Sequence, residues 1–513
     1  MTFVTDPKLK AKAPDPIAVA VHLRTKAPTD TVGHFTRTDP KLDLTRIPIV
    51  GKLLKKRWLQ FVLIVPNQIV FWLVIFTGLL GTVNPGLNFA TAITWYIWFC
   101  VVFVLMVVVG RAWCSMCPFG GFGEWIQRKT FFKRTQKALG LGLKYPDRLA
   151  QLGLISSVAT FVLLTYIEEF FNIAGPGTPH DTSFMVIGIV LSATIVFLLF
   201  ERRTFCRYLC PLSSLIGTVG AVGSFAGFRT KDRDACQACE TKSCMRGGDE
   251  GFGCPWYTWP GSADSNLYCG LCTECYKACP TNNVGLFVQK PLTSVVAPSR
   301  KRMDVAVVAA ILLGLVAFQQ LNALGFYGPL DNWLNAHTGW PGYPNPIDYF
   351  GFIALFAYVP TLVFKAGSKL FSKGTIAKNT GTFMTRRSEF RNWFVAGMYA
   401  MIPIVGADYF ARQLPKFFKH ATRIVPAVAH PFGVSVASLY NFRILQDPRI
   451  IAVQVAVMGL GVIGSIYASI RISKRDLVLA KPRSVAPRLY FVATILLMGI
   501  ALALLYIPMA AAN

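Results

Sequence analysis

The residues best suited to chemistry are cysteines gathered in one short stretch. The segment "CGLCTECYKACP" contains Cys269, Cys272, Cys275 and Cys279, and Pro280 follows the last of them. The spacing C-x2-C-x2-C-x3-C-P is typical of a bacterial run that ligates a [4Fe-4S] cluster. Three thiolates this close together wrap a short loop around three corners of one cube, whereas a zinc site usually takes two from each knuckle. The stretch therefore predicts an iron-sulfur cluster.

Four further cysteines lie upstream with the spacing C-x2-C-x4-C-x9-C-P. In two-cluster ferredoxins the fourth cysteine of each run binds the other cluster. We therefore predict one cluster on Cys236, Cys239, Cys244 and Cys279, and a second on Cys254, Cys269, Cys272 and Cys275. The alternatives are a disulfide knot or paired zinc sites. The spacing favours iron and sulfide, and disulfides are rare in the cytoplasm, where the charge pattern below puts this segment.

Two more cysteine pairs each stand directly before a proline. Cys114 and Cys117 precede Pro118 in "GRAWCSMCPFGG", and Cys206 and Cys210 precede Pro211 in "RRTFCRYLCPLSS". Proline favours the first position of a helix, so we expect Cys117 and Cys210 to cap two helices. Free amides and the helix dipole there favour a thiolate. The four thiolates could hold a third cluster, bind a soft metal ion such as copper(I) or zinc, or form redox dithiols; the alternative is cysteines that only fill space.

The elements that position these cysteines are predicted to be membrane helices. Of the 513 residues, 53% are hydrophobic and only 15% are charged, against a charged fraction of about 25% in a typical soluble protein. Nine segments approach the ~20 apolar residues that a membrane crossing needs. They run over residues 58–82, 93–110, 151–172, 183–200, 304–322, 348–366, 392–412, 450–470 and 489–510. The two Cys-Pro motifs follow the second and the fourth.

The formal charge of +27 could suggest a nucleic acid partner. The basic residues alternate with the apolar segments, however, as the positive-inside rule describes, so we predict no nucleic acid binding. This alternation puts the N-terminus and all the motif cysteines on the cytoplasmic side. Residues 413–449 fit poorly, because they should lie outside yet include Lys416 and Lys419. Since the first fifty residues lack the apolar core of a signal peptide, we expect a multi-pass protein of a bacterial inner membrane.

The chain divides into four predicted regions. Residues 1–57 form a basic cytoplasmic tail, 58–228 a four-helix membrane core with both Cys-Pro motifs, 229–303 a cytoplasmic double-cluster ferredoxin domain, and 304–513 a five-helix membrane region. Within the core, residues 212–228 are apolar but short and glycine-rich, so we interpret them as a re-entrant or interfacial segment. The predicted fold class is an all-α polytopic membrane protein of about nine transmembrane helices, with an inserted bacterial-type two-[4Fe-4S] ferredoxin domain.

This combination resembles the membrane-bound polyferredoxins over roughly residues 58–290. These include the NapH-type quinol dehydrogenase subunit, the NosR electron donor and the CcoG-type assembly factor. The resemblance implies two [4Fe-4S] clusters on the eight cysteines of residues 236–279 and a redox role for the four of the Cys-Pro motifs. The chain departs from the pattern in its first pair, which has two intervening residues where the family usually has three. It also lacks a NosR-like flavin domain and adds five spans.

The sequence thus predicts an electron-transfer component of an oxidoreductase system. It would relay electrons between a cytoplasmic or quinone-pool donor and a membrane or periplasmic acceptor, with membrane lipid and redox proteins as partners. The alternatives are a factor that matures a metal or cofactor, and a redox-sensing regulator. Glu168 and Glu169 could pass protons to or from a quinone, or be the solvated end of a helix. His420 and His430 could bind a metal or a partner in an outer loop, or belong to a polar interfacial segment.

Overall fold

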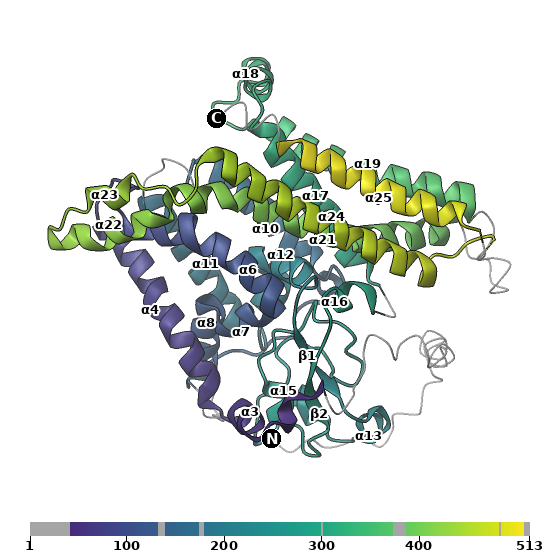
Figure 1. Ribbon diagram of the computed structural model, residues 1–513. Helices are drawn as coiled ribbons and strands as arrows, with labels where there is room; N and C mark the ends of the chain where they lie inside the picture. Colours follow the sequence, from purple (N-terminus) through teal and green to yellow (C-terminus); the bar gives the residue numbers. More distant parts are fainter. Residues whose placement is uncertain are drawn as a thin grey trace.

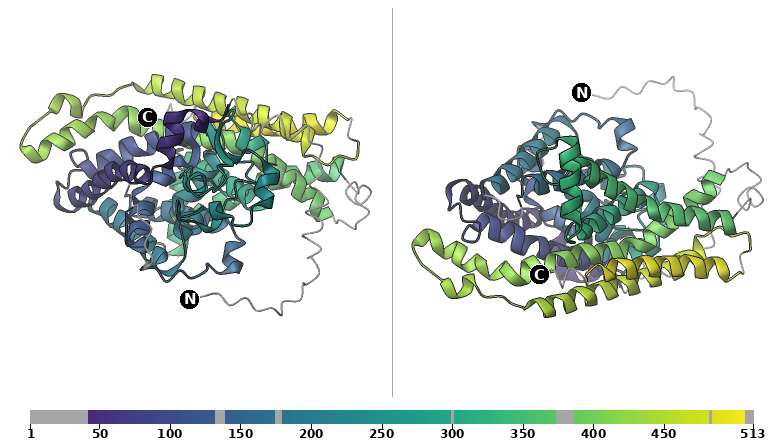
Figure 2. Two further views of the ribbon diagram at one scale, coloured as in Figure 1. Left: turned by 90° about the horizontal axis from the view of Figure 1, so that it is seen from below. Right: turned by 90° about the horizontal axis from the view of Figure 1, so that it is seen from above.

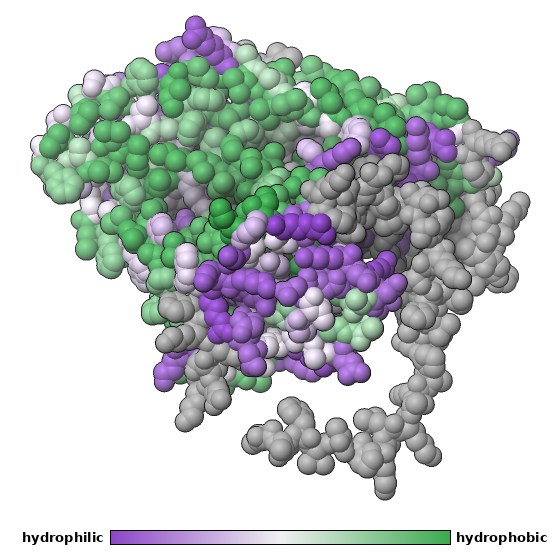
Figure 3. Space-filling view, turned by 60° about the horizontal axis from the view of Figure 1, so that its bottom comes forward, coloured by the Kyte–Doolittle hydropathy of each residue, from purple (hydrophilic) through white to green (hydrophobic). Residues whose placement is uncertain are grey.

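The computed structural model describes residues 42–131, 139–173, 179–298, 301–372, 386–481 and 484–506. A large helical part stands above a smaller domain that holds the two strands, β1 (Ala226–Thr230) and β2 (Val284–Val288) (Figure 1). Hydrophobic residues cover much of the helical part, and hydrophilic residues gather on the smaller domain (Figure 3). The surface therefore divides as expected for a membrane-embedded part joined to a soluble one.

The helices of the first half position both Cys-Pro motifs. Those of eight residues or more are α3 (Pro48–Lys55), α4 (Trp58–Leu80), α6 (Phe99–Val109), α8 (Pro118–Arg128), α10 (Ile155–Phe170), α11 (Pro179–Leu199) and α12 (Pro211–Val219). Shorter elements join them, namely η2 (Leu44–Arg46), α5 (Phe89–Thr91), η3 (Ala92–Trp98), η4 (Gly110–Ala112), α7 (Trp113–Met116), α9 (Asp147–Ala150) and η5 (Phe205–Leu209).

The second half contributes six further helices of twelve residues or more within the described ranges. They are α17 (Met303–Asn322), α18 (Tyr327–Thr338), α19 (Pro346–Phe371), α21 (Arg386–His420), α24 (Asp447–Arg475) and α25 (Ala486–Leu504). The short helices η6 (Ala421–Arg423), α22 (Ile424–Ala429), η7 (His430–Phe432) and α23 (Ala437–Tyr440) connect α21 to α24. Most of the apolar length of α17 and α21 is buried, whereas α4, α19 and α24 leave most of theirs exposed. Helices α24 and α25 run along one side of the molecule in both views of Figure 2.

The structure has a helix at each of the nine segments predicted to cross the membrane. Within the described residues, eight helices are long and apolar enough to do so. The third predicted segment, 151–172, forms α10, which has only 16 residues and is not among the eight. Turns at both ends shorten it, at residues 151–154 and 171–173. The glycine-rich segment 212–228 contains the nine-residue α12, too short for a crossing, in line with its interpretation as an interfacial segment.

Helix α21 extends well beyond its predicted end at residue 412. It continues to His420, with Pro403 and Pro415 inside it. The basic residues assigned to an outer loop therefore lie partly on a helix that packs against α6 and α12. Lys419 forms an ion pair of 2.5 Å with Asp447 at the start of α24. Lys419 thus has an acidic partner within the protein. This partner explains a basic residue that does not fit the positive-inside pattern.

The soluble domain is built around an antiparallel pair of strands and the N-terminal segment that docks on it. Strands β1 and β2 pair from Ala226 with Val288 to Thr230 with Val284. The Leu286 amide donates to the Asp43 carboxylate at 3.2 Å, and Lys231 pairs with the same carboxylate at 3.4 Å. The domain also contains α13 (Arg233–Ala238), α14 (Ser243–Arg246), α15 (Glu274–Lys277) and α16 (Thr293–Val296). Part of the predicted tail, from residue 42 onward, is therefore packed against this domain.

Candidate functional site

Each Cys-Pro motif turns the chain from one helix into the next. Helix α6 ends at Gly110, whose φ of 63° reverses the chain before α7 and its cysteines. Cys117 then takes an extended conformation and caps α8, which begins at Pro118. Cys210 caps α12 in the same way before Pro211. Both helix starts agree with the sequence-based expectation. The Gly120 and Phe119 amides contact the Cys117 thiol, so unpaired backbone donors face this position.

The two motifs bring their four thiols into one place. The Cys206 thiol is close enough to interact electrostatically with Cys210, Cys117 and Cys114. Cys210 interacts in the same way with both cysteines of the first motif. Helix α8 lies against the second motif, since a Cβ added at Gly120 would be 3.3 Å from the Cys206 sulfur. The structure therefore forms a four-thiol site, here called the membrane-edge site, from Cys114, Cys117, Cys206 and Cys210.

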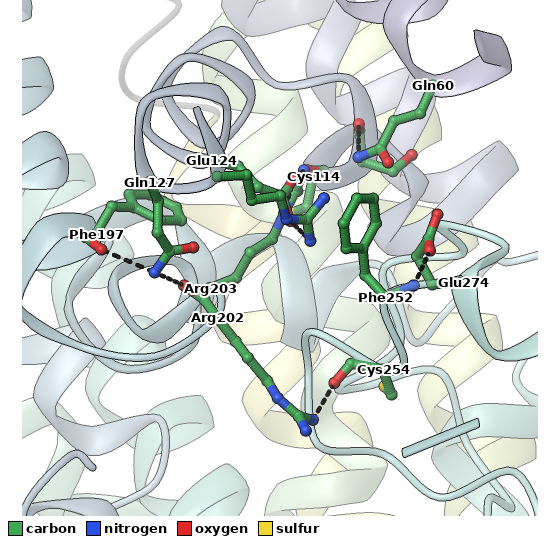
Figure 4. A network of polar contacts seen from close by, with 12 residues as sticks. Gln60, Cys114, Glu124, Gln127, Phe197, Arg202, Arg203, Phe252, Cys254 and Glu274 are labelled. Atoms are coloured by element: carbon green, nitrogen blue, oxygen red, sulfur yellow. Dashed lines mark hydrogen bonds and ion pairs between the residues drawn. The ribbon is translucent and has the colours of Figure 1, made fainter. Parts of the chain in front are cut away.

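Two fully buried arginines flank the membrane-edge site. Arg203 is 0% exposed and donates to the Cys114 carbonyl oxygen and to the Glu124 carboxylate, the latter at 2.7 Å from Nη2. Figure 4 shows Arg203 beside Glu124 and Cys114. Arg111 is 1% exposed and donates from Nη1 to the Leu267 carbonyl oxygen at 2.8 Å and from Nη2 to the Cys206 carbonyl oxygen at 3.2 Å. Both cations are therefore held against the backbone of the two motifs.

The charge of Arg111 is not neutralised by any carboxylate of the described residues. Its Nε also lacks a hydrogen-bond partner there. A buried charge is costly unless an opposite charge faces it. Four thiolates around an iron-sulfur cluster would supply negative charge beside this guanidinium. The residues of the membrane-edge site thus fit such a group, and the site lies where the cation needs a counter-charge.

Trp256 connects the membrane-edge site to the soluble domain. It lies two residues after Cys254, is 1% exposed, and its ring lies under the guanidinium groups of Arg111, at 4.6 Å, and Arg203, at 5.9 Å. Arg202 donates to the Cys254 carbonyl oxygen at 2.8 Å, as Figure 4 shows. These contacts are buried or half-buried. They join residues of the helical part to residues of the soluble domain. The loop at Cys254 is therefore fixed against the second Cys-Pro motif.

The eight cysteines of residues 236–279 fall into two sets. Cys275 interacts electrostatically with Cys254, Cys269 and Cys272. Cys244 interacts with Cys236, Cys239 and Cys279. The sets adjoin where the Cys254 amide donates to the Cys244 carbonyl oxygen at 2.8 Å. Cys275 and Cys244 each also interact with the other set, Cys275 with Cys244 and Cys244 with Cys254. The crossed assignment of the ligands stays a prediction. What the two sets bind stays a prediction.

Burial keeps most of these thiols protonated unless a cation is present. It raises the pKa of Cys244 to about 12, with neighbouring cysteines adding to the effect. Burial likewise raises the pKa of Cys254 and Cys275. The Thr241 hydroxyl has the opposite effect on the half-exposed Cys239, because its hydrogen bond lowers the pKa of this thiol. Metal binding must displace these protons, so assembly of a cluster here would be coupled to proton release.

The alternatives to iron-sulfur clusters find little support in this geometry. All thirteen cysteines lie in the described residues and all are free thiols, so the structure contains no disulfide knot. No group of three or more His, Cys, Asp or Glu in the described part of the chain converges as ligands of a single metal ion. A single zinc ion requires such convergence. Four thiolates that bind different corners of a cube do not need to converge on one point.

A cavity of about 220 Å³ opens onto the membrane-edge site. All four of its cysteines line the cavity, together with apolar and aromatic residues that include Trp95, Trp98, Phe161 and Tyr409. The cavity is elongated along α10. Ser157 on this helix donates to the Cys210 carbonyl oxygen at 2.6 Å. Glu168, which also lines the cavity, stands eleven residues further along, or roughly 16 Å away at 1.5 Å per residue.

Charged residues gather at the far end of this cavity. Glu168 interacts with Lys416, Glu169 and Arg412. Glu169 accepts hydrogen bonds from Gln319 at 3.3 Å and Asn322 at 3.4 Å. Both glutamates are half-buried; α17 supplies polar partners to Glu169, and α21 places two cations near Glu168. Sequence reasoning missed Arg412 and Lys416, although the basic residues that spoiled the charge alternation were a signal that this segment is unusual.

The two histidines of the predicted outer loop do not form a shared site. His420 is the last residue of α21 and its ring lies 5.1 Å from that of Tyr96. His430 lies on η7 and is exposed. Neither belongs to a metal-binding group within the described ranges. Cys100 is buried within α6.

Comparisons with known proteins agree with this chemistry. A family model described as a 4Fe-4S binding domain matches residues 91–138 and 182–226. These segments contain the Cys-Pro motifs, and thus all four cysteines of the membrane-edge site, but none of the cysteines of residues 236–279. An uncharacterised protein of Methanocaldococcus jannaschii is 26% identical over 183 residues, which are 35% of this chain and 65% of that protein. The chain thus spans less than two thirds of that relative's length. No solved structure matches.

These findings define the class of the protein. Two of its segments match a 4Fe-4S binding domain, which supports an iron-sulfur, ferredoxin-like protein. Its apolar helices fit a multi-pass membrane protein. Together they indicate iron-sulfur electron transfer at a membrane. The narrower resemblance to the NapH, NosR and CcoG types remains a prediction.

Proposed function

We propose that this protein relays single electrons between a quinone in the membrane and a redox protein that docks on the soluble domain. Three [4Fe-4S] clusters would form the relay: one at the membrane-edge site and one on each cysteine set of residues 236–279. The observation that carries the proposal is the cavity lined by all four membrane-edge cysteines. It gives a flat apolar molecule access to the site from within the helical part.

The order of the relay follows from the contacts between the sites. Arg203 interacts with Cys206 of the membrane-edge site and with Cys272 of the nearer set. Cys244 adjoins Cys254 and belongs to the farther set. Cys239 of that farther set is half-exposed. Electrons would therefore pass from the membrane-edge site through the set of Cys272 to the set of Cys239, or the reverse, with the redox protein binding near Cys239.

The cavity also offers the groups that quinone chemistry requires. Oxidation of a quinol releases two electrons and two protons. The four cysteines would hold the cluster that accepts the electrons one at a time. Glu168 would accept the two protons in turn at its carboxylate, releasing the first to solvent before it takes the second, and Arg412 and Lys416 face it with positive charge. General acid-base groups of this kind typically contribute 10²- to 10⁴-fold to a rate.

We also propose that the soluble domain faces the cytoplasm of a bacterial cell. The alternation of basic residues between the apolar segments supports this orientation. A reporter enzyme active only outside the cytoplasm tests it. Fused after Gly339, which ends α18, the reporter should be active. Fused after Ser372, which ends α19, it should be inactive, and the opposite pattern would reverse the orientation.

Reduction of the purified, anaerobically prepared protein by a quinol tests the proposed function. The wild-type clusters should lose their visible absorption when quinol is added. Replacement of Cys114, Cys117, Cys206 and Cys210 by serine should abolish this reaction, while dithionite still reduces the two remaining clusters. Glu168→Gln should slow the reaction about 10²-fold or more. Glu169→Gln is the matched control, because Glu169 does not line the cavity, and its effect should be smaller.

Two results would contradict the proposal. The first is a wild-type protein that dithionite reduces but quinol does not. The second is a serine variant that quinol still reduces at the wild-type rate.

A further inference from the structure

A second hollow lies between α10 and α11. Its volume is about 600 Å³. Most of its wall is apolar, with Leu164, Ile167, Phe184, Met185, Ile189 and Val196 among the lining residues. We call it the α10/α11 groove. Since α11 is a candidate membrane span of which only a third is buried, the groove lies on a surface that fits contact with lipid.

The groove adjoins the cavity at the membrane-edge site. Leu164 on α10, Met185 and Ile189 on α11, and Pro211 at the start of α12 line both. Pro211 directly follows Cys210, so the shared wall includes the second Cys-Pro motif. A molecule with its polar end in the cavity would need to displace only these shared side chains to reach the groove.

We propose that the α10/α11 groove holds the isoprenoid tail of the quinone whose head group occupies the cavity. This inference rests on the proposed function and names the substrate class, a long-tailed quinone that enters from the lipid between α10 and α11. The tail is a chain of branched hydrocarbon units without polar groups, and it matches an apolar wall that offers few hydrogen-bonding partners. Apolar contact of this kind contributes to binding in proportion to the area removed from water.

The shape of α11 supports this occupant. Gly188 lines the groove, and a Cβ added there would meet no atom within 4 Å. Glycine within a helix costs roughly 0.5–1 kcal/mol relative to alanine. A larger side chain at this position would therefore be accepted by the fold and would favour the helix. It would also occupy the groove, so the open space at Gly188 gives a direct way to block it.

Gly188→Trp tests the inference in the full-length protein reconstituted in vesicles. The rate of cluster reduction is measured against concentration for an isoprenoid quinol and for tetramethylquinol, which has no tail. We expect KM for the isoprenoid quinol to rise at least tenfold and KM for tetramethylquinol to change less than twofold. Gly351→Trp is the matched control, because Gly351 lies on a candidate span, has no atom within 4 Å of an added Cβ and lines neither hollow.

The other outcomes overturn the inference. Unchanged kinetics with the isoprenoid quinol would mean that ordinary lipid fills the groove. An equal loss with both quinols would mean that the tryptophan disturbs the cavity and that the tail binds elsewhere. If neither quinol reduces the wild-type protein while dithionite does, the proposed function fails and the groove has no quinone to hold. Because the first two outcomes require an active wild type, they are distinct from that failure.

Discussion

At the scale of single residues, Arg111 places a buried positive charge beside the membrane-edge site. It is buried, held by carbonyl oxygens of Leu267 and Cys206, and not paired with a carboxylate of the described residues. A positive charge stabilises the reduced, more negative form of a cluster. Arg111 should therefore raise the reduction potential of the cluster proposed at this site. The buried pair of Arg203 and Glu124 contributes less, since its charges offset each other.

Arg111→Gln should lower the midpoint potential of the membrane-edge cluster. Two unit charges about 8 Å apart interact by about 2 kcal/mol at an effective dielectric constant of about 20, which corresponds to roughly 90 mV for one electron. Arg111→Lys keeps the charge and should shift the potential by much less. Redox titration followed by EPR measures both variants. Equal shifts in the two variants would show that Arg111 acts through packing and not through its charge.

At the scale of elements, the abrupt end of α6 positions the first Cys-Pro motif. Gly110 has a φ of 63°, and a Cβ added there would overlap the Ser224 side chain. Only glycine satisfies both the backbone conformation and the close approach. The residues that follow form η4 and α7, which carry Cys114 to the membrane-edge site. The geometry of the site thus depends on one glycine four residues before the first cysteine.

Gly110→Ala should destabilise the protein by about 1–3 kcal/mol and reduce its iron content, because strained backbone and overlap displace the motif. Gly339→Ala is the control: its φ is 71°, but no atom lies within 4 Å of an added Cβ. It should cost less stability and leave the iron content unchanged. Thermal unfolding and iron analysis measure both. An iron content equal to wild type in Gly110→Ala would refute the role assigned to this glycine.

The sequence predicted some of these elements better than others. Pro118 and Pro211 indicated two helix starts because proline acts locally, and both helices begin there. Helix α21 continues eight residues past the predicted span, which ends at residue 412, because Lys416 and Lys419 make the following residues look like a solvated loop. In the structure Arg412 and Lys416 face Glu168, a partner from another helix. Pairing between distant residues leaves no local signal, so this part of the cavity could not be predicted.

At the scale of the whole molecule, the membrane-edge site joins two regions that the sequence describes separately. The assignment of the eight cysteines of residues 236–279 to two clusters comes from their spacing, since the ligands of a cluster follow a local pattern, and it stays a prediction. The role of residues 304–513 could not. Helices α17 and α21 from this region contribute Gln319, Tyr409, Arg412, Gln413 and Lys416 to the cavity. The second half of the chain thus completes a cavity whose cysteines all come from the first half.

The central claim is that the membrane-edge cysteines hold a third cluster, next in line to the two of the soluble domain. Iron and sulfide analysis of anaerobically purified protein tests it most directly. We predict about twelve irons and twelve sulfides per chain, because each [4Fe-4S] cluster contains four of each. Replacement of Cys114, Cys117, Cys206 and Cys210 by serine should lower both numbers to about eight. About eight irons in both the wild type and the variant would contradict the account.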